Sequence, residues 1–276
     1  MDPDAKLNID PELTRSVLKH FLRDEIRKVG FEKAVIGLSG GVDSAVACYL
    51  AAQAIGAHNV LALRLPYRAS SPDSLAHAQL VVDALGVPSD TIDITPMVDP
   101  LFERLPDLDA RRRGNVMARQ RMIVLYDRSA AIGGLVVGTS NKTELLLGYG
   151  TLFGDMAAAV NPLGDLYKTQ VRRLAAHLGV PQPIIEKPPS ADLWAGQTDE
   201  GELGLTYADA DRLLVLLVDE RYTPAEAIDA GFNAKLVERV WRMVRVSHFK
   251  RRGSIIAKLS SRTIGVDFNY LRDWGY

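Results

Sequence analysis

Residues 39–44, SGGVDS, have the composition of a loop that could bind phosphate. They follow an apolar run and precede a stretch of small residues that favours a helix. Gly40 and Gly41 would let backbone amides approach an anion without a Cβ in the way, and the start of a helix adds positive dipole character. Ser39 and Ser44 supply hydroxyl donors. The loop lacks the lysine of a Walker phosphate loop, so any phosphate it binds is held in a different way.

Asp43 is the unusual member of this loop. A carboxylate beside a phosphate repels it unless a divalent cation lies between the two. The alternative is purely structural: a left-handed turn followed by a helix N-cap at Asp43 or Ser44, which is common. The loop by itself leaves both interpretations open.

Further polar side chains that could do chemistry occur in four later segments. They are Arg119 and Arg121 in 114–126, Thr139 and Glu144 in 136–155, Lys168 in 161–171, and Ser190 in 189–211. Taken singly, each has a structural explanation, such as the basic face of a solvated amphipathic helix for the two arginines. Only their combination carries information.

The surrounding pattern predicts the elements that must position these residues. Short apolar segments predict buried strands at 33–39, 59–66, 91–95 and 134–140. Helical spacing lies between them at 43–56, 72–86 and 115–132, before them at 11–29, and after them at 165–179, 207–220, 223–231 and 233–249. This alternation predicts an α/β fold with a doubly wound, Rossmann-like, mostly parallel sheet and helices on both faces. Ligands bind such sheets at the carboxyl edge, where SGGVDS lies.

We expect one domain over residues 1–276, because no repeat or linker interrupts the pattern. The core is expected over about 33–180 and a helical part over about 207–250, followed by a basic tail. Two irregular stretches, 147–165 and 186–206, have the length of functional loops.

Composition excludes several classes of protein. The chain has 276 residues, 47% of them hydrophobic, and a formal net charge of −1, which gives no global attraction to nucleic acid or to a membrane. The N-terminus resembles no secretory signal, and the densest apolar run, at 213–218, is too short to span a bilayer. One cysteine, Cys48, and five scattered histidines predict neither a disulfide nor a zinc site. We expect a cytoplasmic protein.

The motifs in their order resemble a known family. SGGVDS after a strand resembles the pyrophosphate loop of the N-type ATP pyrophosphatases, which cleave ATP between the α and β phosphates. GN-x-x-AR-x-RM at 114–122 and PSADLWAGQTDE at 189–200 narrow the resemblance to ammonia-dependent NAD synthetases, from the first helix to about residue 252. The resemblance implies that ATP adenylates the carboxylate of deamido-NAD with release of pyrophosphate, and that ammonia then displaces AMP to give NAD.

The resemblance also implies roles for particular residues. Those implied to bind ATP are Gly37, Leu38, Ser39, Gly40, Gly41, Val42, Asp43, Ser44, Thr139, Lys168 and Ser190. Those implied to bind deamido-NAD are Arg119, Asp155, Phe249 and Lys250, and those implied to hold Mg²⁺ are Asp43 and Glu144. Lys168, Asp43 and Asp155 are the implied catalytic residues. Lys168 would stabilise charge on the departing pyrophosphate, and Asp155 would lie near the ammonia pocket, although a loop-capping role is its alternative.

The chain departs from the family pattern at two positions. Many members have FTKYGDGG-x-D where this chain has GTLFGDMAAA at 150–159, so Leu152 replaces a substrate-binding lysine and Ala159 an aspartate. TLFGDMA is closer to the synthetase domains of glutamine-dependent relatives, so a separate glutaminase is a possible partner. The implied assembly is a homodimer with the dinucleotide site at the subunit interface. The basic tail, 247–262, either binds substrate or is simply solvated.

Two other interpretations compete. Another ATP pyrophosphatase, such as a GMP synthetase domain or a tRNA-modifying enzyme, is disfavoured by the near-neutral charge and by the 189–211 motif. A nucleotide-binding regulatory module is disfavoured because it needs no Asp43, Glu144 and Lys168 together. For the synthetase, we expect loops 147–160 and 190–206 to close over the site and protect the adenylate from water.

Overall fold

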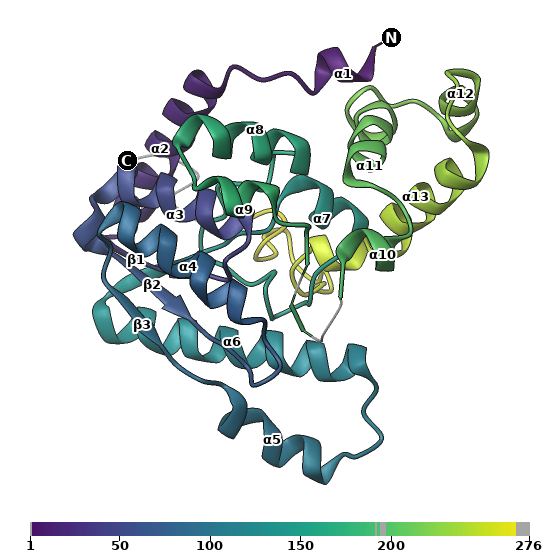
Figure 1. The fold of residues 1–276 in the computed structure, drawn as a ribbon. Helices are drawn as coiled ribbons and strands as arrows, with labels where there is room; N and C mark the ends of the chain where they lie inside the picture. Colours follow the sequence, from purple (N-terminus) through teal and green to yellow (C-terminus); the bar gives the residue numbers. More distant parts are fainter. Residues whose placement is uncertain (1, 191, 194–196, 269–276) are drawn as a thin grey trace.

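A computed structural model describes residues 2–190, 192–193 and 197–268. At its centre is a four-stranded parallel sheet in the order β3-β2-β1-β4 (Figure 1). The strands are β1 (Lys33–Gly37), β2 (Val60–Arg64), β3 (Ser89–Thr91) and β4 (Gly134–Val137). Val35 of β1 aligns with Leu61 of β2 and with Val136 of β4, so the carboxyl ends of the three strands meet at one edge.

The two faces of the sheet have separate apolar layers, as side-chain alternation along a strand requires. Ala34 and Ile36 pack in one layer with α2 (Pro11–Lys28), α3 (Val42–Ile55), α4 (Pro72–Leu85) and α8 (Lys168–Leu178). Val35 lies in the opposite layer with α5 (Thr95–Arg104) and α6 (Ala110–Ile132). The predicted doubly wound α/β fold is confirmed.

A third apolar cluster lies in the C-terminal helices. It is built from α11 (Tyr207–Leu214), the π-helical turn Val215–Asp219, α12 (Pro224–Asp229) and α13 (Ala234–Val246). Tyr167 and Leu147 join this cluster from the segments that follow the sheet. The helical part therefore packs beside the carboxyl edge of the sheet (Figure 1).

Several elements differ from the sequence expectations. The strand predicted at 91–95 lies at 89–91 instead, and α5 was not predicted. Pro96 and Pro100 argue against a helix in the sequence, which is why α5 was not expected. Pro96 is tolerated in the first turn of α5, where the missing N–H would have no partner within the helix. Short helices occur in or beside the two stretches expected to be irregular: α7 (Lys142–Leu147), α9 (Gln182–Glu186) and α10 (Asp199–Leu203). A short helix α1 (Pro3–Lys6) and 3₁₀ turns at Ala57–Asn59 and His248–Arg251 lie elsewhere in the chain.

Cys48 lies fully buried in α3, as expected of a core residue. Burial raises the pKa of its thiol to about 12. Within the described residues, no helix combines the length and apolarity that crossing a membrane requires.

Candidate active site

The SGGVDS loop makes a tight turn at the carboxyl end of β1. Gly40 has a φ of +78°, and a Cβ at this position would lie 2.1 Å from the carbonyl oxygen of Ser74, so only glycine fits. The N-cap of α3 is Gly41, without a side-chain cap. The structural alternative of a side-chain cap at Asp43 or Ser44 is therefore wrong. Ser44 instead donates its hydroxyl to the carbonyl of Gly41 (3.0 Å), which leaves the first amides of α3 uncapped.

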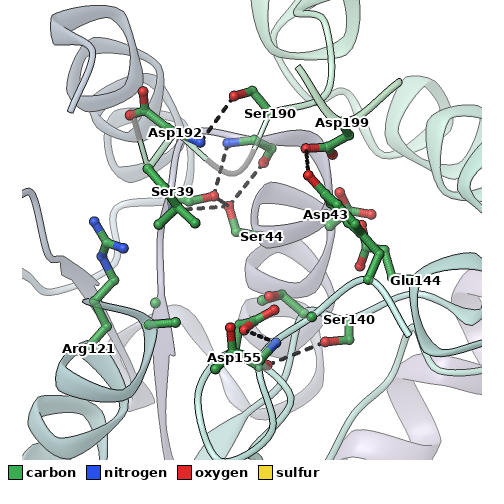
Figure 2. A pocket seen from close by; sticks show the side chains of 18 of the residues that line it. Ser39, Asp43, Ser44, Arg121, Ser140, Glu144, Asp155, Ser190, Asp192 and Asp199 are labelled. Atoms are coloured by element: carbon green, nitrogen blue, oxygen red, sulfur yellow. Dashed lines mark hydrogen bonds between the residues drawn. The ribbon is translucent and has the colours of Figure 1, made fainter. Parts of the chain in front are cut away.

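A cavity of about 1220 Å³ opens above this loop. Of the predicted site residues, all except Gly40 line it; Gly40 is buried against Ser74. The cavity residues labelled in Figure 2 come from the β1 loop, α6, the segment after β4 and the 190–199 segment. Residues far apart in the sequence thus share one cavity.

Lys168 forms the charged centre of the cavity. Its side chain is 4% exposed, its Nζ contacts Oδ2 of Asp43, and it lies 3.4 Å from Oε1 of Glu144. Burial opposes the charged form of Lys168, but the two carboxylates outweigh it and raise the pKa of the ammonium. Burial raises the pKa of Glu144, whereas the charge of Lys168 acts to lower it. Lys168 is therefore a fixed cation beside the SGGVDS loop, the candidate phosphate loop at residues 39–44.

Local sequence fixes the two acids. Asn141 and Glu144 form a capping box at the start of α7, in which Oε2 of Glu144 accepts the backbone N–H of Asn141 (3.1 Å). The second oxygen of Glu144 remains directed at Lys168. The side chain of Asn141 donates to Oδ1 of Asp43 (2.9 Å), and the hydroxyl of Thr143 accepts the backbone N–H of Lys168 (3.0 Å). One turn after β4 therefore orients all three charges.

The residues present fit a magnesium ion. Asp43 and Glu144 offer hard carboxylate oxygens close enough to contact the same ammonium. Among the residues that the structure describes, no group of three or more metal-ligating side chains converges. Mg²⁺ in nucleotide sites is held by one or two carboxylates together with phosphates and water, so a pair of acids suits it.

Asp155 and Arg119 lie on another wall of the cavity. Oδ1 of Asp155 accepts the backbone N–H of Thr151 (2.8 Å), and burial raises the pKa of its carboxyl. The carboxylate therefore caps its own loop as well as lining the cavity. Arg119 is exposed and its Nε donates to the carbonyl of Leu152 (3.1 Å). Leu152 lines the cavity, whereas Ala159 does not.

The start of the basic tail is anchored rather than solvated. Nζ of Lys250 donates to the carbonyls of Gly148 and Gly150 (both 2.7 Å), and burial lowers its pKa. Phe249 lines the cavity and is 59% exposed. Lys250 thus fixes the turn that carries Asp155, while Phe249 stays free to meet a ligand.

The segment that carries Ser190 is bonded to the start of α4 and lines the same cavity as the SGGVDS loop. Asp192 accepts the backbone N–H of Ser71 (3.1 Å) and the hydroxyl of Ser74 (2.8 Å) at the start of α4. Ser190 accepts the N–H of Asp192 (3.1 Å), and Lys187 donates to Ser74 (2.9 Å). Other members of the PSADLWAGQTDE motif, Ala191 and Trp194 to Gly196, lie outside the described residues.

Sequence reasoning missed Asp199 and two tyrosines. Asp199 accepts hydrogen bonds from the hydroxyls of Tyr149 (2.9 Å) and Tyr207 (3.1 Å) and lines the cavity. The ring of Tyr207 lies 5.1 Å from Nζ of Lys168. The acid was visible in the 189–211 motif, but its partners come from α11 and from the loop after α7, so no spacing indicated them.

Together the parallel sheet, the uncapped helix start and the lysine between two acids define a nucleotide-binding α/β protein. A model of the NAD synthase family matches residues 14–254. The chain belongs to this family, and the resemblance seen in its motifs is confirmed.

Known relatives agree along nearly the whole chain. The NH(3)-dependent NAD(+) synthetase of Trichlorobacter lovleyi is 60% identical over 271 residues, covering 98% of this chain and 99% of the relative. A solved NMN synthetase from Francisella tularensis is 35% identical with a TM-score of 0.80, covering 91% of this chain and all of that one. An NH3-dependent NAD synthetase from Campylobacter jejuni, solved with nitrate, is 30% identical with a TM-score of 0.78 and the same coverage.

Proposed function

We infer that the chain amidates deamido-NAD to NAD with ammonia at the expense of ATP, as a carbon–nitrogen ligase. Membership of the NAD synthase family carries this conclusion. The single structural observation that supports it best is the convergence of the SGGVDS loop with Lys168, Asp43 and Glu144 in one cavity. The roles of individual residues below are proposals.

In the first step, a carboxylate oxygen of deamido-NAD attacks the α-phosphorus of ATP and pyrophosphate leaves. The uncapped amides of α3, together with Ser39 and Ser44, bind the phosphates of ATP. Thr139 and Ser190 also contact the ATP molecule. Lys168 neutralises the charge that builds on the departing pyrophosphate. Mg²⁺ held by Asp43 and Glu144 would supply further charge neutralisation on the phosphates.

In the second step, ammonia attacks the acyl carbon and AMP leaves. Asp155 lines the cavity, and burial raises the pKa of its carboxyl. A carboxylate with a raised pKa is a stronger proton acceptor than an exposed one. Asp155 therefore retains ammonium at the site and accepts its proton.

Recognition of deamido-NAD falls to Arg119, Phe249 and Lys250, with Leu152 giving an apolar contact in place of a charged one. Arg119 shares one exposed face of α6 with Ile123 and Tyr126, at helical spacing. We propose that this face pairs with a second subunit, so that the dinucleotide lies at a homodimer interface. The sheet and the helical part both line the cavity, which supports one functional domain over the chain.

The function is tested by measuring NAD and AMP from ATP, Mg²⁺ and deamido-NAD, with ammonium or glutamine as nitrogen source. We expect NAD and AMP in equal amounts with ammonium, and NAD from glutamine only when a separate glutaminase is added. Nicotinate mononucleotide is the matched control substrate, because one similar solved structure is an NMN synthetase. If AMP release did not depend on deamido-NAD, the proposal would be contradicted.

A further inference from the structure

Arg121 is a charged side chain in the cavity to which the reaction above gives no role. It lies two residues after Arg119 on α6, so the two side chains leave different faces of the helix. Arg119 is exposed, whereas Arg121 is packed against the carboxyl end of β2, where its Nε donates to the carbonyl of Leu65 (2.9 Å). Arg121 lines the same cavity as the phosphate loop (Figure 2).

The terminal amino groups of this guanidinium have no hydrogen-bond or ion-pair partner among the described residues, because the bond to Leu65 uses Nε alone. Burial lowers the pKa of Arg121, while the charges of Asp192 and Asp155 act in the opposite direction. An arginine nonetheless stays protonated at neutral pH. Arg121 is partly buried and lines the cavity, so these free N–H groups can bind an anionic ligand there.

The position of Arg121 selects the ligand group. Figure 2 places Arg121 on the opposite side of the cavity from Asp43 and Glu144, which accompany Lys168. The charges that act on it belong to Asp192, which is bonded to the start of α4, and to Asp155, in the loop after β4. The phosphate that must meet both the nucleotide loop and the acceptor is the α-phosphate, because the carboxylate of the substrate attacks it.

We propose that Arg121 binds the α-phosphate of ATP and, after the first step, the same phosphate in the adenylate. This inference rests on the proposed function and deepens it. Two parallel N–H groups of a guanidinium match two non-bridging phosphate oxygens. Lys168 then serves the leaving pyrophosphate and Arg121 the phosphoryl group that is transferred.

The assignment gives Arg121 a task in both steps. In the first, the bond from the carboxylate oxygen to the α-phosphorus forms, and the bond to the bridging oxygen breaks with its electron pair leaving on pyrophosphate. In the second, the C–N bond forms and the acyl C–O bond breaks, with its electron pair leaving on AMP. The proton released from nitrogen passes to Asp155 or to water, and Arg121 holds the phosphate that departs as AMP.

The test compares AMP, adenosine, pyrophosphate and deamido-NAD as ligands of the full chain, by calorimetric titration of the wild type, Arg121→Gln and Arg121→Lys. We expect Arg121→Gln to weaken AMP about 10- to 100-fold, the size of a lost charged hydrogen bond, and Arg121→Lys to restore part of the loss. Affinity for adenosine and pyrophosphate stays unchanged, which also shows that the variants are folded. Arg128→Gln, an exposed arginine seven residues further along α6, is the matched control and leaves AMP affinity unchanged.

Three results would overturn the assignment. AMP affinity could survive in Arg121→Gln; AMP, adenosine and pyrophosphate could all weaken equally, which marks a structural role; or only deamido-NAD could weaken, which places the guanidinium on the substrate carboxylate. Failure of the proposed function is a separate result, seen when the wild type releases no AMP in response to deamido-NAD. The AMP titrations would still show whether Arg121 binds the phosphate of AMP.

Discussion

At the scale of single residues, Lys168 distinguishes an enzyme from a nucleotide sensor. Its ammonium contacts Asp43 and Glu144 at the phosphate loop, where charge would build on leaving pyrophosphate. We predict that Lys168→Met lowers the rate of AMP formation about 10²- to 10³-fold, as loss of one preorganised charge does. ATP affinity, measured by titration, falls far less.

Lys235→Met is the control for this substitution, because Lys235 is exposed on α13 and lies outside the cavity. A Lys168→Met protein that forms AMP at the wild-type rate and only binds ATP more weakly would support the sensor interpretation instead.

A second residue-scale prediction concerns pH and Cys48. Burial raises the pKa of this thiol to about 12 in the folded protein, against about 8.5 in an unfolded chain. The folded state therefore binds the thiol proton more tightly than the unfolded state does. The contribution of Cys48 to the free energy of unfolding is complete below about pH 8.5 and is lost as pH rises toward the pKa of the folded state. We predict that the native thiol reacts with an aromatic disulfide reagent at pH 9 only as fast as the protein unfolds.

Denaturant supplies the internal control, because the same thiol must react fast once the chain is unfolded. Rapid labelling of the native protein at pH 9 would show that the thiol is accessible and that its pKa is not raised.

At the scale of elements, Lys187 and Asp192 bond their part of the chain to the start of α4, at one wall of the cavity. The carboxylate of Asp192 is held there by Ser71 and Ser74. We predict that ATP, Mg²⁺ and deamido-NAD together protect residues 147–160 and 190–206 from proteolysis, since an adenylate must be shielded from water. Mass spectrometry of limited digests maps the cut sites.

The exposed segment 253–262 is the internal control for this digest, because it lies away from the cavity and should still be cut with ligands bound. Asp192→Ala should lose part of the protection. Equal cleavage of both loops with and without ligands would contradict closure.

Elements also show what the sequence could and could not reveal. β1, β2 and β4 were predictable because buried parallel strands are continuous apolar runs. β3, Ser89–Thr91, is polar and short, so its neighbours Ile92 and Ile94 drew the prediction downstream. The phosphate loop was recognisable because its residues are contiguous. The hydrogen bonds from Tyr149 and Tyr207 to Asp199 could not be recognised in the sequence, because the fold brings these partners together from different segments.

At the scale of the whole molecule, the proposed homodimer is argued from exposed apolar side chains on α6 and α5. Ile123 and Tyr126 on α6 are 62% and 42% exposed, on the face that carries Arg119. Met97 and Leu101 on the adjacent α5 are 43% and 41% exposed. We predict a dimer in sedimentation experiments and a shift to monomer in Ile123→Asp, because a buried unpaired charge opposes association.

The monomeric variant should also bind deamido-NAD more weakly, while ATP affinity is retained, if the dinucleotide lies at the interface. Asp substitution at Val17, which is 56% exposed on α2, is the control. A wild type that sediments as a monomer at the concentrations of the activity assay would contradict a dinucleotide site at a subunit interface.

The most direct test of the central claim follows an oxygen atom. In the proposed reaction, the deamido-NAD carboxylate attacks the α-phosphorus of ATP in the cavity lined by the phosphate loop, Lys168 and Asp155. With the carboxylate labelled with ¹⁸O and ammonium as nitrogen source, mass spectrometry should find one labelled oxygen in each AMP and none in pyrophosphate. Label in pyrophosphate, or AMP without label, would contradict adenylation of the substrate as the route to NAD.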